Sequence, residues 1–143
     1  MKQRTNVGFL VKQINNIYEK DFNNQLKKLD LTSSQAEVLD FLFRCDEEEV
    51  NQRDIEKALS LKNPTVTGIL KRMEEKGFVM ILPSEKDKRC KNVYLTEQAF
   101  DIEKKMEAVR RKVDKNLTLG MTKREVEALQ KMLNRVLYNV AEP

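Results

Sequence analysis

The sequence of 143 residues lacks histidine and tryptophan, and it contains only two cysteines, four glycines and three prolines. Without histidine, Cys45 and Cys90 cannot form the Cys and His sets that hold structural zinc, so we expect no metal site and no cofactor. Two cysteines are also too few for a disulfide scaffold. The scarcity of glycine and proline favours a mainly helical chain over a turn-rich β-sandwich or barrel.

Long hydrophobic runs are absent as well. The first apolar segment is interrupted by Lys12, Gln13 and Asn15, so we expect no secretory signal, no membrane span and a cytoplasmic protein. The sequence also lacks the GxxxxGK[ST] phosphate loop and the GxSxG nucleophile elbow, and it offers no histidine base. These absences predict that the protein is not an enzyme.

The residues that are present describe one soluble domain, residues 1–143, with 40% hydrophobic and 35% charged residues. The net charge of +4 is unevenly distributed, because residues 62–91 contain eight Lys and Arg against four Asp and Glu. A basic cluster in a small domain favours a polyanionic partner, although a charge of this size also serves solubility alone.

Apolar residues recur at spacings of three and four, which is typical of amphipathic helices. Thr32 with Gln35 and Thr122 with Glu125 form capping-box patterns, Thr96 is a further cap, and Asn51 and Asn63 are expected N-caps, the latter followed by Pro64. These signals predict helices at about 6–28, 33–45, 52–61, 64–76, 97–117 and 123–140.

The predicted fourth helix ends at Gly77 and has two distinct faces. Its inward face is apolar, whereas its outward face is short, polar and basic and consists of Thr65, Thr67, Gly68, Lys71 and Arg72. Two short strands, 78–82 and 92–95, follow around a charged loop and predict a β-hairpin. Short helices followed by a hairpin are the winged form of the helix-turn-helix. Because an α-helix fits the major groove of B-DNA, this pattern indicates a DNA-binding protein.

The sequence resembles the MarR family of bacterial winged helix-turn-helix transcriptional regulators. The segments that carry the resemblance are Leu31–Leu39, Leu61–Thr67, Met73–Val79, Asp87–Arg89 and Val93–Thr96. The resemblance implies a mainly α fold with a winged helix lobe at 31–96, whose wing is 79–96, and dimerisation helices at 6–30 and 97–143. The apolar stripe of the last helix agrees with a homodimer, since it would otherwise be an exposed patch.

The resemblance also implies which residues contact double-stranded DNA. We expect major-groove contacts from Asn63, Thr65, Thr67 and Lys71, phosphate contacts from Lys62, Arg72, Lys86, Lys88 and Lys91, and a minor-groove contact from Arg89 oriented by Asp87. The alternative for the threonines and the wing lysines is a solvated surface. Gly68 stands where many relatives carry a larger polar or basic side chain, so one DNA contact is expected to be missing.

The expected function is a homodimeric regulator, by family default a repressor, that binds a palindromic operator and is released by a small aromatic or phenolic effector. Two alternatives stay open. One is a winged helix that binds protein instead of DNA. The other is a regulator controlled by oxidation of Cys90, because the flanking Arg89 and Lys91 favour the thiolate that oxidants attack.

Overall fold

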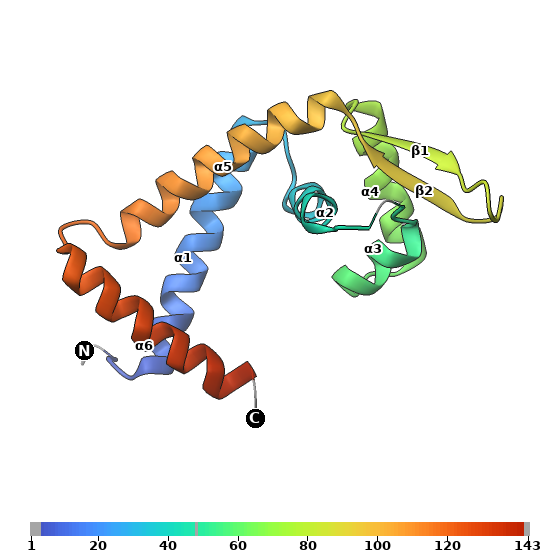
Figure 1. The fold of residues 1–143 in the computed structure, drawn as a ribbon. Coiled ribbons are helices and arrows are strands. Elements are labelled where there is room, and N and C mark those ends of the chain that lie inside the picture. The colour runs from blue at the N-terminus through green and yellow to red at the C-terminus, as the bar shows by residue number, and fades with distance from the viewer. Residues whose placement is uncertain (1–3, 48, 142–143) are drawn as a thin grey trace. The chain divides into compact units, whose positions relative to one another are not determined.

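The computed structural model describes residues 4–47 and 49–141. The chain divides into two compact units between Arg110 and Arg111, so the expectation of a single domain stays a prediction. Figure 1 labels the helices and strands in chain order: α1 (Val7–Lys28), α2 (Ser33–Arg44), α3 (Gln52–Leu59), α4 (Asn63–Glu75), β1 (Val79–Pro83), β2 (Lys91–Leu95), α5 (Glu97–Leu117) and α6 (Lys123–Ala141). The mainly α fold with a β-hairpin is confirmed.

Side-chain caps fix the starts of several helices. At α2, the Gln35 backbone N–H donates to Thr32 Oγ1 at 3.1 Å, and the Thr32 N–H donates back to Gln35 Oε1 at 3.3 Å. Thr122 and Glu125 form the same reciprocal pair before α6, which confirms both predicted capping boxes. Asn51 also caps α3 as predicted, and its N–H is held in turn by the Asp54 carboxylate at 3.0 Å.

The start of α4 corrects one prediction. Lys62, not Asn63, is the N-cap: its backbone is extended, with φ −84° and ψ 155°, and its carbonyl accepts from the Val66 N–H at 3.1 Å. The sequence rule favoured Asn63 because asparagine is the better capping side chain. Pro64 permits the earlier start, because any residue in the first turn of a helix can lack an N–H.

The end of α4 agrees with the predicted glycine stop. Gly77 follows the C-cap and has φ +81°, a left-handed conformation that other residues adopt only with strain. A Cβ at this position would also clash with the side-chain amide of Gln98. The left-handed backbone therefore requires glycine, and any Cβ would in addition force the Gln98 side chain to shift.

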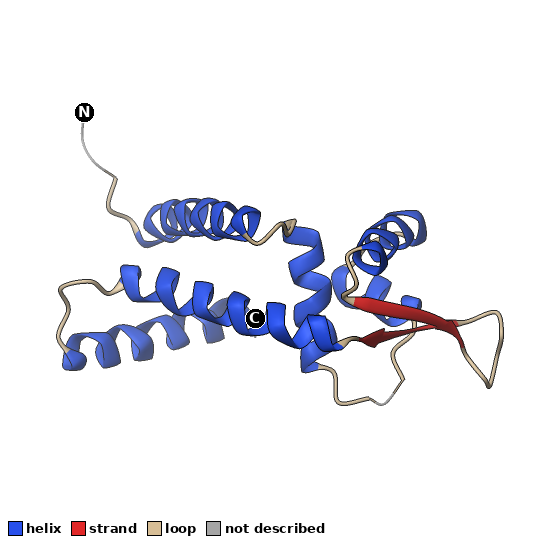
Figure 2. Cartoon of the chain, turned by 90° about the horizontal axis from the view of Figure 1, so that it is seen from above, coloured by secondary structure: helices blue, strands red, loops and turns tan. Residues whose placement is uncertain are grey.

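The hairpin is antiparallel, with Met80 opposite Tyr94 and Ile81 opposite Val93. Both strands lie within one residue of their predicted bounds. Asn51 forms an additional bridge to Asn92, and the Val93 N–H donates to the Val50 carbonyl at 2.8 Å. This short pairing joins the wing to the start of α3, and the hairpin loop projects beyond α3 and α4 (Figures 1 and 2).

The hydrophobic core lies in the winged helix lobe, where α2, α3, α4, β1, β2 and the first part of α5 each contribute buried residues. Its largest fully buried side chains include Leu39, Ile55, Leu70, Met73 and Met106. By contrast, α6, all of whose residues are described, has no buried side chain. Across the described residues, no helix is long and apolar enough to span a membrane.

Candidate nucleic-acid interface

The two faces of α4 separate as the sequence predicted. Val66, Leu70 and Met73 are at most 1% exposed and anchor the helix in the core. The residues expected to contact DNA all lie on the exposed side of α4 or at its start: Lys62, Asn63, Thr65, Thr67, Lys71 and Arg72. The helix therefore presents a polar, basic surface whose position is fixed by its apolar side.

Hydrogen bonds within the wing loop hold the next group of predicted residues. The Asp87 carboxylate accepts from the Arg89 backbone N–H at 3.0 Å, and its Oδ1 lies 3.8 Å from Arg89 Nε. The side chain of Arg89 is nevertheless 95% exposed. Lys86, Lys88 and Lys91 are exposed as well. The Asp87 carboxylate thus holds the backbone at Arg89, and the orientation of the Arg89 side chain by Asp87 stays a prediction.

The base of the wing and the start of α4 line one pocket of about 220 Å³. Its walls include Arg89 and Lys91 from the wing, Asn63 and Thr67 from α4, and Arg53 from α3. The structure thus brings together basic residues that are distant in the sequence. Arg53 was not identified from the sequence, because α3 offers no periodic basic face that would have marked it.

The hydroxyl of Thr67 is engaged inside the protein. It donates to the Asn63 carbonyl at 2.8 Å and accepts from Gln52 Nε2 at 2.8 Å, and the same Gln52 amide lies 3.4 Å from the Asn63 carbonyl. Gln52, the first residue of α3, therefore attaches α3 to the first turn of α4. Sequence reasoning missed this link, because only the packing of two helices reveals it.

The opposite end of α4 is held by Lys76. Its Nζ donates to the Asp30 carbonyl and, at 3.0 Å, to Gln35 Oε1. Asp30 itself has a left-handed backbone with φ 57°, and its carboxylate lies 3.8 Å from the same Nζ. Both ends of α4 are consequently connected by polar contacts to neighbouring elements.

The two cysteines have different surroundings. Cys45 is partly buried and packs against the core, as expected for a small core residue. Cys90 is also partly buried, and its Sγ lies 3.9 Å from Asp87 Oδ2. Since that neighbour is a carboxylate and not one of the flanking cations, the structure adds no support for oxidation control, which stays a prediction.

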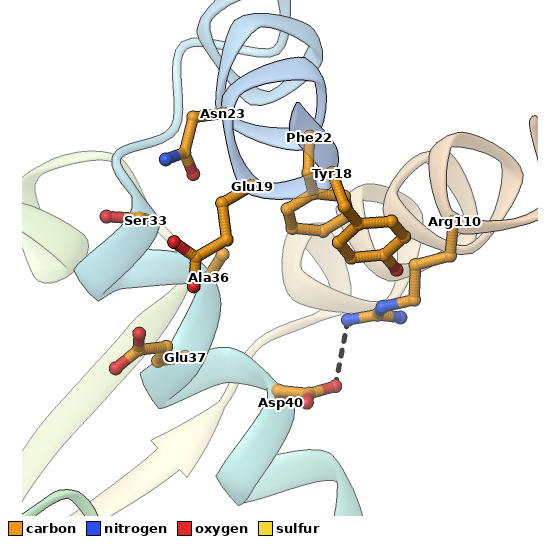
Figure 3. Close-up of a pocket in the computed structure, with 9 residues that line it drawn as sticks. All are labelled: Tyr18, Glu19, Phe22, Asn23, Ser33, Ala36, Glu37, Asp40 and Arg110. Carbon is orange, nitrogen blue, oxygen red and sulfur yellow. Dashed lines mark hydrogen bonds and ion pairs between the residues drawn. The ribbon is translucent and has the colours of Figure 1, made fainter. Parts of the chain in front are cut away.

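A second pocket, of about 370 Å³, lies among α1, α2 and α5 (Figure 3). The rings of Tyr18 and Phe22 are parallel within 2°, with centroids 6.3 Å apart. The carboxylates of Glu19, Glu37 and Asp40 also line this pocket. Its walls therefore combine aromatic surface with negative charge.

Arg110 closes one side of this pocket through ion pairs. Its Nη2 lies 2.8 Å from Asp40 Oδ1 (Figure 3). Its Nη1 lies 3.3 Å from Glu103 Oε1 and 3.0 Å from Glu107 Oε2. Burial works to lower the pKa of the Arg110 guanidinium, but Asp40, Glu107 and Glu103 outweigh it and raise the pKa above its ordinary value. Arg110 therefore connects α5 to α2 as a permanent cation.

Comparison with known proteins identifies the class of this fold. The sequence profile of the MarR family matches residues 31–91, and MarR from E. coli is 29% identical, with 95% of this chain and 99% of that chain covered and a TM-score of 0.80. The segment 31–91 thus matches the MarR family. MarR family proteins are transcription regulators, and the matched residues run from the N-terminal side of α2 to the start of β2, which includes all of α4 and the wing loop.

Two further solved structures share the fold of this chain. MepR of Staphylococcus aureus, described as a transcription regulator of the multidrug efflux pump MepA, is 22% identical, with 95% of this chain and 99% of that chain covered and a TM-score of 0.86. A MepR–DNA complex from S. aureus is 23% identical, with the same coverage and a TM-score of 0.72.

Proposed function

We propose that this protein is a MarR family regulator that represses transcription by binding a palindromic operator as a homodimer. The observation that carries the proposal is the exposed basic surface formed by α4 and the wing. Lys62, Lys71 and Arg72 lie on or beside α4, while Arg89 extends from a loop that its own hydrogen bonds shape. A helix flanked by cations fits the major groove, and an adjacent arginine fits the minor groove.

The likeness to solved structures supports the same activity. MepR has been crystallised with DNA, and its fold matches this chain across 95% of its length. Repression requires only that a bound protein obstruct the polymerase, which a winged helix dimer can do without further machinery. The remaining exposed residues of the interface, Lys86, Lys88 and Lys91, are proposed phosphate contacts.

The test is a selection from a library of random DNA duplexes at about 50 and 200 mM salt. The wild-type protein is expected to enrich a palindromic sequence and to lose affinity steeply as salt increases, because each phosphate contact releases counterions. Arg89→Ala should weaken binding of the selected duplex by about 1–3 kcal/mol. Arg111→Ala, which removes the same charge from an exposed position of α5, is the matched control.

Failure to enrich any sequence at either salt concentration would refute DNA binding and favour a winged helix that binds protein. Equal losses from Arg89→Ala and Arg111→Ala would show that net charge, not the wing, governs affinity. Circular dichroism of both variants must match the wild type, since a partly unfolded protein would bind DNA weakly for trivial reasons. A promoter reporter carrying the selected sequence then distinguishes repression from activation.

The proposed homodimer is supported by exposed apolar faces in the first and last helices. In α1, five large apolar residues are 43–63% exposed: Val7, Leu10, Val11, Ile14 and Ile17. In α6, Met132, Leu133, Leu137 and Val140 are 50–71% exposed. Soluble monomers rarely expose continuous apolar patches of this kind, whereas symmetric dimers bury them.

Light scattering coupled to size exclusion tests the dimer directly. The wild type is expected at twice the chain mass, and Leu137→Glu at the mass of one chain, because it places a charge in the buried interface. Ala128→Glu adds the same charge on the side of α6 opposite to Leu137 and should leave the dimer intact. A Leu137→Glu protein that still elutes as a dimer would exclude the apolar face of α6 from the interface.

The proposed effector site is the pocket among α1, α2 and α5. Its volume of about 370 Å³ suits a small aromatic compound, and the Tyr18 and Phe22 rings offer a surface for stacking. The Arg110 cation in this pocket is already paired with Asp40, Glu103 and Glu107, so the carboxylates of Glu19 and Glu37 disfavour an anion. We therefore propose an aromatic effector that is cationic or neutral, which narrows the expectation of an aromatic or phenolic compound.

Calorimetric titration with three probes of similar size tests this chemistry. An aromatic ammonium compound should bind more tightly than a phenol, and a benzoate should bind most weakly. Glu37→Gln should reduce the preference for the cation, while Glu97→Gln on the exposed start of α5 should not. Tightest binding of the benzoate would overturn the proposed effector class, and an effector must also lower operator affinity.

A further inference from the structure

Gly68 is a glycine that the fold itself does not require. It lies in the middle of α4 with an ordinary helical backbone, unlike Gly77 and Gly120, whose φ values are both +81°. Apart from its two chain neighbours and the nearby backbone of α4 itself, no heavy atom of the described chain lies within 4 Å of a Cβ built at Gly68. Neither backbone strain nor packing therefore requires glycine there, although glycine is the least favourable helical residue after proline.

The position of Gly68 points to a contact with another molecule. Thr65 is three residues before it and Lys71 three residues after it, so all three share one exposed face of α4. Arg72, one turn further on, is exposed on the same side. Gly68 thus leaves the middle of this face without a side chain, and the C-terminal part of the face carries Lys71 and Arg72. Elsewhere, glycine on a contact surface allows another molecule to approach the backbone closely.

We propose that Gly68 is a specificity-determining residue, at which the backbone of α4 lies directly against one base pair in the major groove. The inference rests on the proposed DNA-binding function. Its consequence is that a side chain at position 68, even a methyl group, separates the helix from that base pair. The opposite interpretation is that Gly68 simply leaves a phosphate or base contact unmade, in which case a larger side chain would be neutral or would improve binding.

Gly68→Ala distinguishes the two interpretations, because stability and affinity should change in opposite directions. The thermal midpoint should rise by about 2–4 °C, since alanine favours the helix and meets open space. Affinity for the duplex selected by the wild type should fall by about tenfold per half-site, while affinity for a scrambled duplex of equal length should not change. Gly68→Arg should weaken binding of the selected duplex further, despite its added positive charge.

Gly8→Ala is the matched control, because Gly8 is the chain's other helical glycine, and a Cβ built there also meets nothing within 4 Å beyond its chain neighbours and its own helix backbone. It should raise the thermal midpoint without changing DNA affinity. A second selection with Gly68→Ala should retain the wild-type sequence except at one base pair in each half-site. Unchanged or tighter binding by Gly68→Ala or Gly68→Arg would overturn the inference while leaving the proposed function intact. A wild-type protein that selects no DNA would overturn both.

Discussion

The winged helix lobe buries its apolar residues, whereas α6 leaves its apolar residues exposed. In the lobe, Leu39, Ile55 and Met73 are fully buried, and polar contacts connect the ends of α4 to its neighbours. In α6 an equally regular apolar stripe remains exposed, and Leu137 is 60% accessible. The lobe is therefore stabilised by its own core, whereas the stripe of α6 gains its stabilisation only from a surface that covers it.

Truncating one apolar side chain in the lobe and one in α6 should give the largest difference in unfolding free energy between the two regions. Ile55→Ala should lower the free energy of unfolding by about 2–5 kcal/mol at any protein concentration, because it creates a cavity in the core. Leu137→Ala should destabilise only at concentrations where the proposed dimer forms, since association and folding would then be linked. Urea unfolding at two protein concentrations measures both. A concentration-independent cost for Leu137→Ala would contradict the comparison.

The two glycines with a left-handed backbone, one in the lobe and one just before α6, differ in what surrounds them. Gly77 and Gly120 share a φ of +81°, but only at Gly77 does a built Cβ meet another side chain, that of Gln98. Gly120→Ala should cost about 1–2 kcal/mol for backbone strain alone. Gly77→Ala should cost more, and Gln98→Ala in the same chain should recover the excess. Equal costs in thermal unfolding would show that Gln98 moves aside freely.

Loss of the hydroxyl at Thr67 should have a smaller effect. Thr67→Val keeps the shape of the side chain but leaves the Gln52 amide without its 2.8 Å acceptor, at a cost of about 0.5–1.5 kcal/mol. DNA affinity should fall along with stability, because the first turn of α4 loses its connection to α3. Thr67→Ser should restore both properties. Weak DNA binding by Thr67→Ser would instead indicate that the threonine methyl group contacts DNA.

The smallest effect is expected from the cap of α6. Hydrogen bonds from the Thr122 backbone and side chain lower the pKa of Glu125 below its ordinary value. The ionised carboxylate therefore stabilises α6 fully above the unfolded pKa of about 4.3, and this contribution is lost as pH falls through the folded pKa. Helical circular dichroism from pH 6 to pH 3 should show less loss in Glu125→Gln than in wild type. Identical profiles would show that the cap contributes nothing.

Local signals in the sequence were sufficient for most of the fold. Capping pairs at Thr32 and Thr122 act between residues three apart, so their helices begin where predicted. The N-cap of α4 lies one residue before the predicted one, because Lys62 has the extended backbone of an N-cap although Asn63 has the better capping side chain. Strand bounds shifted by a similar amount, since pairing with the opposite strand, not propensity, decides where a strand ends.

The candidate site was predictable only in part, and for a physical reason. Exposure of Thr65, Lys71 and Arg89 follows from helical periodicity and from the charged loop. The link from Gln52 to Thr67 spans 15 residues, and it depends on how two helices pack, which local patterns do not encode. The acidic character of the pocket among α1, α2 and α5 likewise arises from carboxylates of different helices.

Asn51 has two structural roles at once. Its side chain caps α3, and its backbone pairs with Asn92 in the wing. The wing is therefore held to the N-cap of α3 by this bridge and by the hydrogen bond from the Val93 N–H to the Val50 carbonyl. The proposed DNA contacts of α4 and of the wing would then lie at a fixed spacing, so one base pair inserted between the two contacted sequences should prevent both from being bound at once.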